Sequence, residues 1–210
     1  MHANSDFARD IFGVGVGRHA KAGGGPIDPR RCVHDRPVSV DAQREGERGV
    51  DRGASSIIFT GTHAGIPFEG RFSRWRADIR FDPANLTASS ASVSIETASA
   101  ADGIALHDQT LPGAEWFDSA RHPNASFRTN AFHALGNGAY EGHGVLTIKG
   151  RAIDTELPFT LRVAGDRAVM DGNARVSRRA AGLGMESDPD AEYVSPDIGV
   201  RVHVEARRAQ

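Results

Sequence analysis

The alternation of apolar and polar side chains after residue 50 restricts this chain to a fold built from strands. It runs through residues 75–81, 92–97, 157–163 and 198–205. Successive side chains of a β-strand point to opposite faces, so this alternation indicates strands with one apolar face. The pattern is typical of antiparallel strands that cover a single core.

Comparable segments at residues 56–63, 125–133, 139–149 and 168–177 bring the predicted set to about eight strands. Turn sequences such as DPANL, GNGA and IKGR separate them. Eight antiparallel strands can close into a barrel, which removes exposed edges and can hold one ligand. The sequence therefore predicts an all-β protein with an eight-stranded antiparallel barrel. A two-sheet sandwich is the alternative.

Two segments depart from the strand pattern. Residues 103–121 predict a short helical or irregular excursion between strands. Residues 1–49 are rich in glycine, proline and charge, and they bury too little apolar surface to offset their chain entropy. We therefore predict a mostly disordered leader over residues 1–49 and one barrel domain over residues 50–208.

Charge and cysteine content exclude several classes of protein. The net charge of −2 argues against a nucleic-acid-binding protein, which needs a basic excess. Cys32 is the single cysteine, so an intrachain disulfide and a four-cysteine zinc site are both excluded. No apolar run approaches the ~20 residues of a membrane span. The N-terminus has no basic start and no long apolar segment, so no signal peptide is identified.

Small residues on the inward faces predict a hollow interior. The strand over residues 140–148 places Gly142 and Gly144 on its apolar face, and the strand over residues 168–176 places Gly172 and Ala174 there. A barrel interior is otherwise filled to nearly crystalline density. The sequence thus predicts an elongated apolar cavity, with a tapered and packed core as the alternative.

Several histidines are candidates for acid–base chemistry. His63 lies near the end of its predicted strand, at the barrel mouth, and the adjacent His107 and Asp108 could form an oriented base. The alternative for each of these side chains is a purely structural role, as a histidine satisfied by one hydrogen bond or as a polar pair in a short helix. His143 and His203 fall on outward positions. The common hydrolase and zinc-protease signatures do not occur, and no predicted residue set holds a metal.

The stretch WFDSARHP, residues 116–123, places two aromatics in a connection between strands. We predict that Asp118 caps a short turn by accepting backbone N–H groups, and that His122 before Pro123 ends it. Trp116 and Phe117 then close one end of the apolar interior. In this interpretation neither Asp118 nor His122 is catalytic.

These segments together resemble the YceI family of bacterial lipid- or polyisoprenoid-binding proteins. The resemblance rests on SSIIFTGTHAGIPFEGRFSRWRADIRFDP, SVSIETAS, WFDSARHPNASFRT, YEGHGVLTIKGRAIDTELPFTL and SRRAAGLG, and covers residues 50–206. It implies a lipocalin-like barrel that binds a long isoprenoid chain, such as a quinone tail or a polyprenyl phosphate. It also implies an exported, periplasmic protein, often encoded beside a membrane b-type cytochrome. No cofactor is implied apart from such a lipid ligand.

The chain departs from the family pattern at two places. Members commonly carry Arg-Ser-Asp-Phe-Gly-Ile-Gly before the last strand, whereas residues 178–184 read RRAAGLG. The change removes an aromatic and an acceptor, which predicts a wider cavity and a different ligand. The usual cleavable signal is also not visible, so a cytoplasmic location is the alternative.

The leading functional hypothesis is therefore a carrier without catalysis. The predicted wall and rim residues, and the predicted head-group residues His63 and Arg178, form one set of candidate ligand-binding residues: Phe59, His63, Phe68, Phe72, Trp75, Trp116, Phe117, Arg178, Leu183 and Met185. One alternative is a barrel isomerase or cyclase that uses His63 or the His107–Asp108 pair. Another is an interaction module for a membrane cytochrome, and a homodimer is a further possibility.

Overall fold

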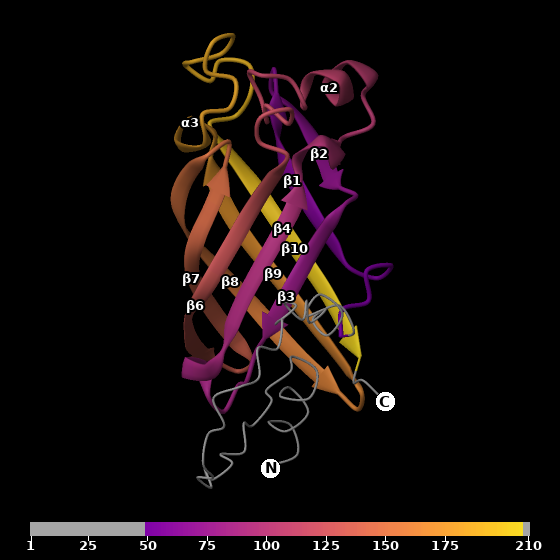
Figure 1. Ribbon diagram of the computed structural model, residues 1–210, viewed down its shortest axis with the longest axis vertical. Coiled ribbons are helices and arrows are strands. Elements are labelled where there is room, and N and C mark those ends of the chain that lie inside the picture. The colour runs from indigo at the N-terminus through magenta and orange to yellow at the C-terminus, as the bar shows by residue number, and fades with distance from the viewer. Residues whose placement is uncertain (1–48, 208–210) are drawn as a thin grey trace, which may run out of the picture.

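Strands dominate the described part of the chain, residues 49–207, in this computed structural model (Figure 1). The prediction for residues 1–49 lies, apart from Gly49, outside the described residues. The strands are β1 (Ser56–His63), β2 (Ile66–Phe72), β3 (Trp75–Arg80), β4 (Ser90–Glu96), β5 (Ala100–Ala101), β6 (Asn124–Gly136), β7 (Ala139–Ile148), β8 (Arg151–Ala164), β9 (Arg167–Ser177) and β10 (Asp197–Arg207). The helices are α2 (Ala105–Thr110), α3 (Arg178–Ala181) and the 3₁₀ turns η2 (Leu86–Ala88) and η3 (Thr97–Ser99).

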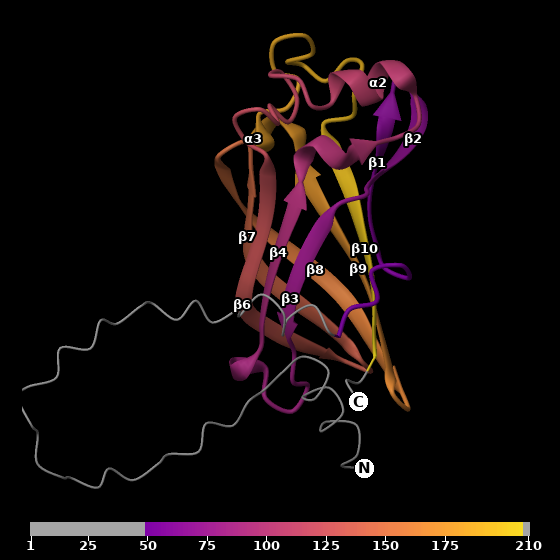
Figure 2. The same cartoon turned by 45° about the vertical axis from the view of Figure 1, so that its right-hand side comes forward.

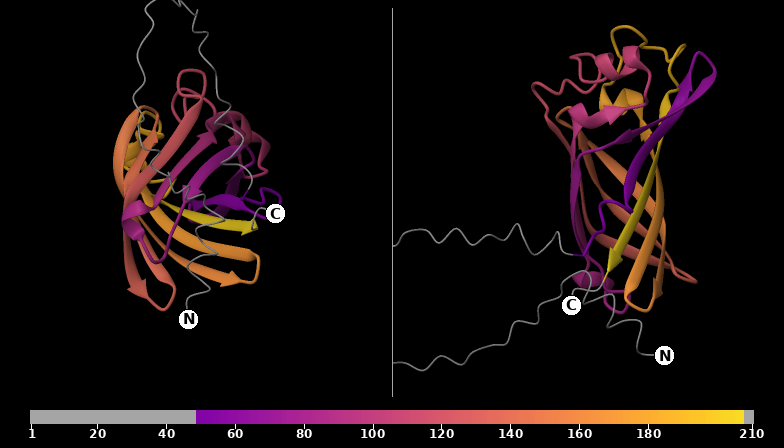
Figure 3. Two further views of the ribbon diagram at one scale, coloured as in Figure 1. Left: turned by 60° about the horizontal axis from the view of Figure 1, so that its bottom comes forward. Right: turned by 90° about the vertical axis from the view of Figure 1, so that its right-hand side faces the viewer.

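All ten strand segments belong to one antiparallel sheet in the order β3-β4-β6-β7-β8-β9-β10-β1-β2-β5. The sheet curls round a common interior, as the view from below the barrel shows (Figure 3). A single curled sheet excludes the two-sheet sandwich.

The ten strand segments correspond to eight strands of the barrel, because two of these strands are each divided by a bend into two segments. Only Ser73 and Arg74 separate β2 from β3, and only η3 separates β4 from β5. The two corners are bonded together: Ser73 N–H donates to the Ser99 carbonyl at 3.2 Å, and Arg74 N–H donates to Ser99 Oγ at 3.1 Å. The prediction of an eight-stranded antiparallel barrel is thus confirmed, with two of its strands each divided by a bend.

Local turn chemistry explains the tight hairpins. At the β6–β7 turn, Asn137 and Gly138 adopt φ values of 50° and 76°. A two-residue hairpin turn of this handedness needs two residues that tolerate the left-handed region, and Asn-Gly is the preferred pair. Strong short-range signals of this kind keep the long strands β6 to β9 in register.

The two ends of the barrel differ. The upper end in Figure 1 carries α2, α3 and the connection from Gly182 to Pro196, and Figure 2 shows α2 lying over the ends of β1 and β2. The predicted excursion over 103–121 therefore consists of α2 followed by turns. No helix within residues 49–207 is long and apolar enough to cross a membrane.

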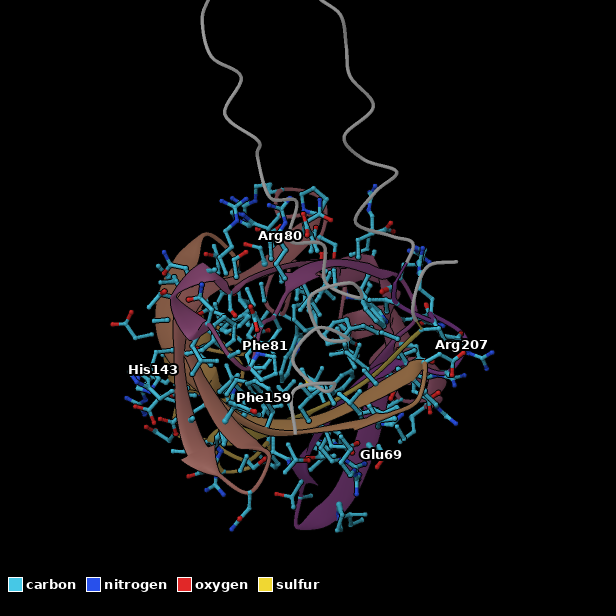
Figure 4. The ribbon with its side chains drawn as sticks, turned by 90° about the horizontal axis from the view of Figure 1, so that it is seen from below. Glu69, Arg80, Phe81, His143, Phe159 and Arg207 are labelled. Atoms are coloured by element: carbon cyan, nitrogen blue, oxygen red, sulfur yellow. The ribbon has the colours of Figure 1, made fainter. Side chains whose placement is uncertain are left out.

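An aromatic cluster occupies the lower end. The Phe81 ring lies 5.2 Å from Phe132, 5.0 Å from Tyr140 and 5.4 Å from Phe159, each measured between centroids and each edge to face. Seen from below, Phe81 and Phe159 lie within the ring of strands, whereas His143 projects outward (Figure 4). The cluster packs the interior between the lower ends of β6, β8 and the β3–β4 connection.

Candidate functional site

A cavity of about 450 Å³ occupies the barrel interior. Its lining extends from His107 of α2 at the upper end to Phe81 and Phe159 at the lower end. Most of the lining side chains are aliphatic or aromatic. The volume is that of an ordinary small-molecule site, and the shape follows the long axis of the barrel.

The small inward residues have two roles. Gly142 and Ala174 line the cavity, as expected for residues that leave space. Gly144 instead makes room for a neighbour, because a Cβ there would lie 2.8 Å from the Phe127 ring and 2.5 Å from the Arg128 carbonyl oxygen. The interior is therefore hollow along part of its length and tightly packed elsewhere.

Nine of the ten predicted ligand-binding residues line this cavity. They are Phe59, His63, Phe68, Phe72, Trp75, Trp116, Phe117, Arg178 and Leu183. Met185, the tenth, is half-buried in the loop after Gly184 and is not among the lining residues. That these side chains contact a ligand is still a prediction.

The connection that carries Trp116 and Phe117 folds over the upper end of the cavity. The Phe117 N–H donates to the Leu111 carbonyl at 3.0 Å, and the Phe117 ring meets Phe72 edge to face at 5.7 Å. The Trp116 ring lies 5.9 Å from the guanidinium carbon of Arg178. Both aromatics thus lie where a lid over the apolar interior was predicted.

Asp118 holds the turn in a different way from the one predicted. Its backbone carbonyl accepts the N–H groups of Arg121 and His122, while its carboxylate binds Arg121 Nε at 2.8 Å. The reason is the left-handed backbone of Asp118, at φ 49°, which lets the carbonyl reach these donors. His122 contributes its carbonyl to Thr97 Oγ1. Neither Asp118 nor His122 lines the cavity.

Arg178 is buried, with 1% of its surface exposed, and most of its donors are used by the protein. Nη1 donates to the carbonyls of Leu183 and Gly184, and Nη2 donates to Asp188 Oδ2 at 2.9 Å and to the Val194 carbonyl. The guanidinium therefore ties the upper loop together. Its Nε is the remaining donor: it is buried and has no hydrogen-bond partner among residues 49–207.

Asp188 neutralises the charge of Arg178. Its carboxylate also accepts the N–H groups of Glu192, Tyr193 and Val194 at 2.8, 3.2 and 2.8 Å. The hydrogen bond from Val194, supported by the other two and by the Arg178 charge, holds the pKa of Asp188 below its usual value. The pair is thus an internal ion pair at the upper end of the cavity.

His63, Asp102 and His107 form a polar cluster at the same end of the cavity. The Asp102 side chain, 4% exposed, binds Nδ1 of His107 at 2.7 Å, and the His107 ring lies 5.1 Å from the His63 ring, edge to face. All three residues line the cavity. Among residues 49–207, no cluster of histidine, cysteine and carboxylate side chains is suited to hold a metal ion.

The predicted pairing of His107 with Asp108 is wrong, because the partner of His107 is Asp102. Adjacent residues on a helix project about 100° apart, so their side chains do not meet. The Asp108 carboxylate instead accepts the N–H groups of Asp102 and Gly103, which fixes the turn that begins α2. Asp102 was missed because its closeness to His107 depends on that turn.

Asp102 is held in its ionised form. Burial acts to raise the pKa of Asp102, but the hydrogen bonds from His107 and from the Ile104 N–H outweigh burial and lower the pKa below 3.8. The Ile104 N–H lies 2.9 Å from Asp102 Oδ1. The carboxylate therefore carries its charge at neutral pH.

Comparison with known proteins supports the fold. The model of the YceI-like domain matches residues 49–206. A UPF0312 protein of Vibrio cholerae is 33% identical over 98 residues, which are 46% of this chain and 52% of that protein. The chain thus spans about half the length of this curated relative.

Two solved structures resemble the barrel. BcnA of Burkholderia cenocepacia is 30% identical, with a TM-score of 0.72, and the match covers 75% of this chain and 99% of BcnA. A polyisoprenoid binding domain from Saccharophagus degradans, implicated in plant cell wall breakdown, is 18% identical, with a TM-score of 0.59. That match covers 77% of this chain and 98% of the domain, and it shows likeness of fold.

Proposed function

Because this chain belongs to the YceI-like domain family, we propose that it binds an isoprenoid lipid inside the barrel and carries or sequesters it. The observation that carries the proposal is the elongated apolar cavity of about 450 Å³. A lipid chain is the ligand class that matches a cavity of this shape and lining. The solved Saccharophagus degradans domain, named for polyisoprenoid binding, supports the same ligand class.

The energy of burial is sufficient for useful affinity. Each buried CH₂ group contributes ~0.8 kcal/mol, so the five carbons of one isoprene unit contribute up to ~4 kcal/mol. Micromolar affinity corresponds to ~8 kcal/mol. Two to four buried units, on the order of the length the barrel can hold, reach this value after the ligand is ordered.

The polar head of the lipid is proposed to lie at the upper end. Among the residues that the structure describes, the ionisable ones lining the cavity are His63, Asp102, His107 and Arg178. The head groups implied by the resemblance are a quinone or a polyprenyl phosphate. Export to the periplasm, a membrane cytochrome partner and a homodimer stay predictions.

Native mass spectrometry of the protein purified from its own host tests the carrier proposal, with lipid extraction and identification. A stoichiometric isoprenoid adduct is expected. Protein that carries no lipid, and takes up neither added quinone nor added polyprenyl phosphate, contradicts the proposal.

The predicted lid is tested by replacing Trp116 and Phe117 together with alanine. Lipid retention should fall while the β-sheet circular dichroism is kept. The matched control replaces Leu135 and Val145, which are exposed by 60% and 41% and do not line the cavity. Equal retention by the two double variants contradicts the role of the aromatics as a lid.

A second candidate function, an isomerase or cyclase, is favoured by one observation: His107 is oriented by Asp102 within the cavity. An oriented histidine of this kind can act as a general acid or base. The candidate predicts pH-dependent turnover of an apolar substrate that His63→Ala or His107→Ala abolishes. A host lipid recovered unchanged after prolonged incubation speaks against it.

A further inference from the structure

In the polar cluster at the upper end of the cavity, Asp102 determines which nitrogen of His107 donates a hydrogen bond and which one accepts. Asp102 is ionised and accepts a hydrogen bond from Nδ1 of His107 at 2.7 Å. A neutral imidazole carries one N–H, and here the carboxylate keeps that proton on Nδ1. The second nitrogen, Nε2, is then an acceptor with a free lone pair.

That acceptor is available to a ligand. Nε2 of His107 has no hydrogen-bond partner among residues 49–207, and His107 lines the cavity. The His63 ring packs against His107 edge to face and narrows the space beside it. A ligand group that donates an O–H at this position would satisfy a polar atom that the described part of the chain leaves unpaired.

A complementary donor lies at the same end. Among the described residues, the buried Nε–H of Arg178 has no hydrogen-bond partner, and Arg178 lines the cavity. His63 and Arg178 are connected through Val194, which pairs with His63 in a β-bridge and accepts a hydrogen bond from Arg178 at its carbonyl. This end of the cavity thus offers an acceptor, Nε2 of His107, and a donor, the Nε–H of Arg178.

The charge at this end is unfavourable for an anion. The ion pair with Asp188 neutralises Arg178, whereas the Asp102 carboxylate leaves a negative charge on the lining at this end. A phosphate group would bring further negative charge into a partly dry site close to that carboxylate. Like charges repel more strongly where water is excluded, so an uncharged head group is favoured.

We propose that the Asp102–His107 pair is a head-group site for an uncharged lipid that donates an O–H, namely an isoprenoid alcohol or a reduced quinone. The inference rests on the proposed lipid-binding function. It favours the alcohol over the corresponding phosphate and the quinol over the quinone. The phosphate adds charge, and the quinone carries oxygen acceptors but no O–H for Nε2.

The test compares four probes on the full chain of 210 residues: geranylgeraniol, geranylgeranyl phosphate, and ubiquinone-2 in its reduced and oxidised forms under anaerobic conditions. Both tryptophans, Trp75 and Trp116, line the cavity, so quenching of intrinsic fluorescence reports binding directly. We expect the alcohol and the quinol each to bind roughly tenfold more tightly than its counterpart, the factor expected for one unmet hydrogen bond.

Two substitutions test the mechanism. His107→Phe keeps a ring but removes the acceptor, so the quinol preference should fall to within about twofold of unity. The preference for the alcohol should fall only in part, because the charge of Asp102 still disfavours the phosphate. Asp102→Asn offers an amide N–H to Nδ1, which moves the histidine proton to Nε2 and should invert the quinol preference in favour of the quinone. The control is His143→Phe on the outer face of β7, which should leave every ratio unchanged. Circular dichroism verifies the fold of each variant.

The outcomes separate the two proposals. If none of the four probes binds, the lipid-binding function itself fails. If all four bind with equal affinity, or the phosphate binds most tightly, the carrier function survives and the head-group site is refuted. A quinol preference that is unchanged in His107→Phe would also refute it. The relative affinities of alcohol and quinol then show which of the two O–H donors the site prefers.

Discussion

Filling the cavity from its wall gives a sharp test of whether the interior is hollow. Ala91 on β4 lines the cavity, with Ile79 of β3 and Thr129 of β6 as its cross-strand neighbours. Ala91→Leu adds three carbon atoms, worth up to ~2.4 kcal/mol of burial at ~0.8 kcal/mol each. Ordering the leucine side chain costs ~0.5–1 kcal/mol. The lipid-free protein should therefore gain about 1–2 kcal/mol in its free energy of unfolding.

The same substitution should weaken lipid binding, because the new carbons occupy the space of the ligand. Stability of delipidated protein is measured by urea denaturation, and affinity by fluorescence quenching with geranylgeraniol. Opposite signs for the two effects are the expected signature of a cavity.

The matched control is Ala168→Leu. Ala168 is 2% exposed, lies in the packed cluster with Phe81 and Phe159, and does not line the cavity. Overpacking there should cost about 1–3 kcal/mol. A comparable loss of stability in Ala91→Leu would refute the reasoning, because it would mean that the wall at Ala91 is already filled.

Three further substitutions probe the frame around the cavity. Gly144→Ala should lower the free energy of unfolding by about 1–3 kcal/mol, because the new Cβ would lie 2.5 Å from a backbone carbonyl oxygen. An unchanged free energy of unfolding, measured by urea denaturation, would contradict this. The hydrogen bond to Asp171 raises the pKa of His203 above 6.5, so the stability this contact adds is fully present below pH 6.5 and disappears as pH rises through the raised value. His203→Gln should accordingly destabilise at pH 6 and have a smaller effect at pH 9, and a pH-independent loss would count against the ion pair. Arg178→Met removes the partner of Asp188 and should speed amide exchange across residues 183–196, whereas unchanged exchange by mass spectrometry would show that other contacts hold the loop.

The barrel was predictable because alternation and turn chemistry act locally. Each strand shows its apolar face in its own sequence, and pairs such as Asn137-Gly138 mark the reversals. The corners that divide two of the strands were not predictable. They contain Ser73, Arg74 and η3, without glycine or proline, and they depend on hydrogen bonds between segments distant in sequence.

The candidate site was predictable where it depends on the alternation of inward and outward side chains along a strand. Aromatics such as Phe59 and Phe72 face inward because their strand positions require it, and they line the cavity. The positions of loop residues could not be predicted in this way. Met185 does not line the cavity, and the partner of His107 is Asp102 rather than Asp108. The paths of these loops are set by hydrogen bonds to the backbone, and the alternation of residue types along the sequence does not reveal such bonds.

The free edge of β3 has a consequence for the width of the barrel. Within the described sheet β3 is bonded along its length to β4 alone, and its outward side chains Arg76, Asp78 and Arg80 are charged and exposed. Such charges discourage a second chain from adding to the edge. Within the described sheet no second ladder of hydrogen bonds holds this edge, so on this side the width of the barrel is set by the β3–β4 ladder and by side-chain packing.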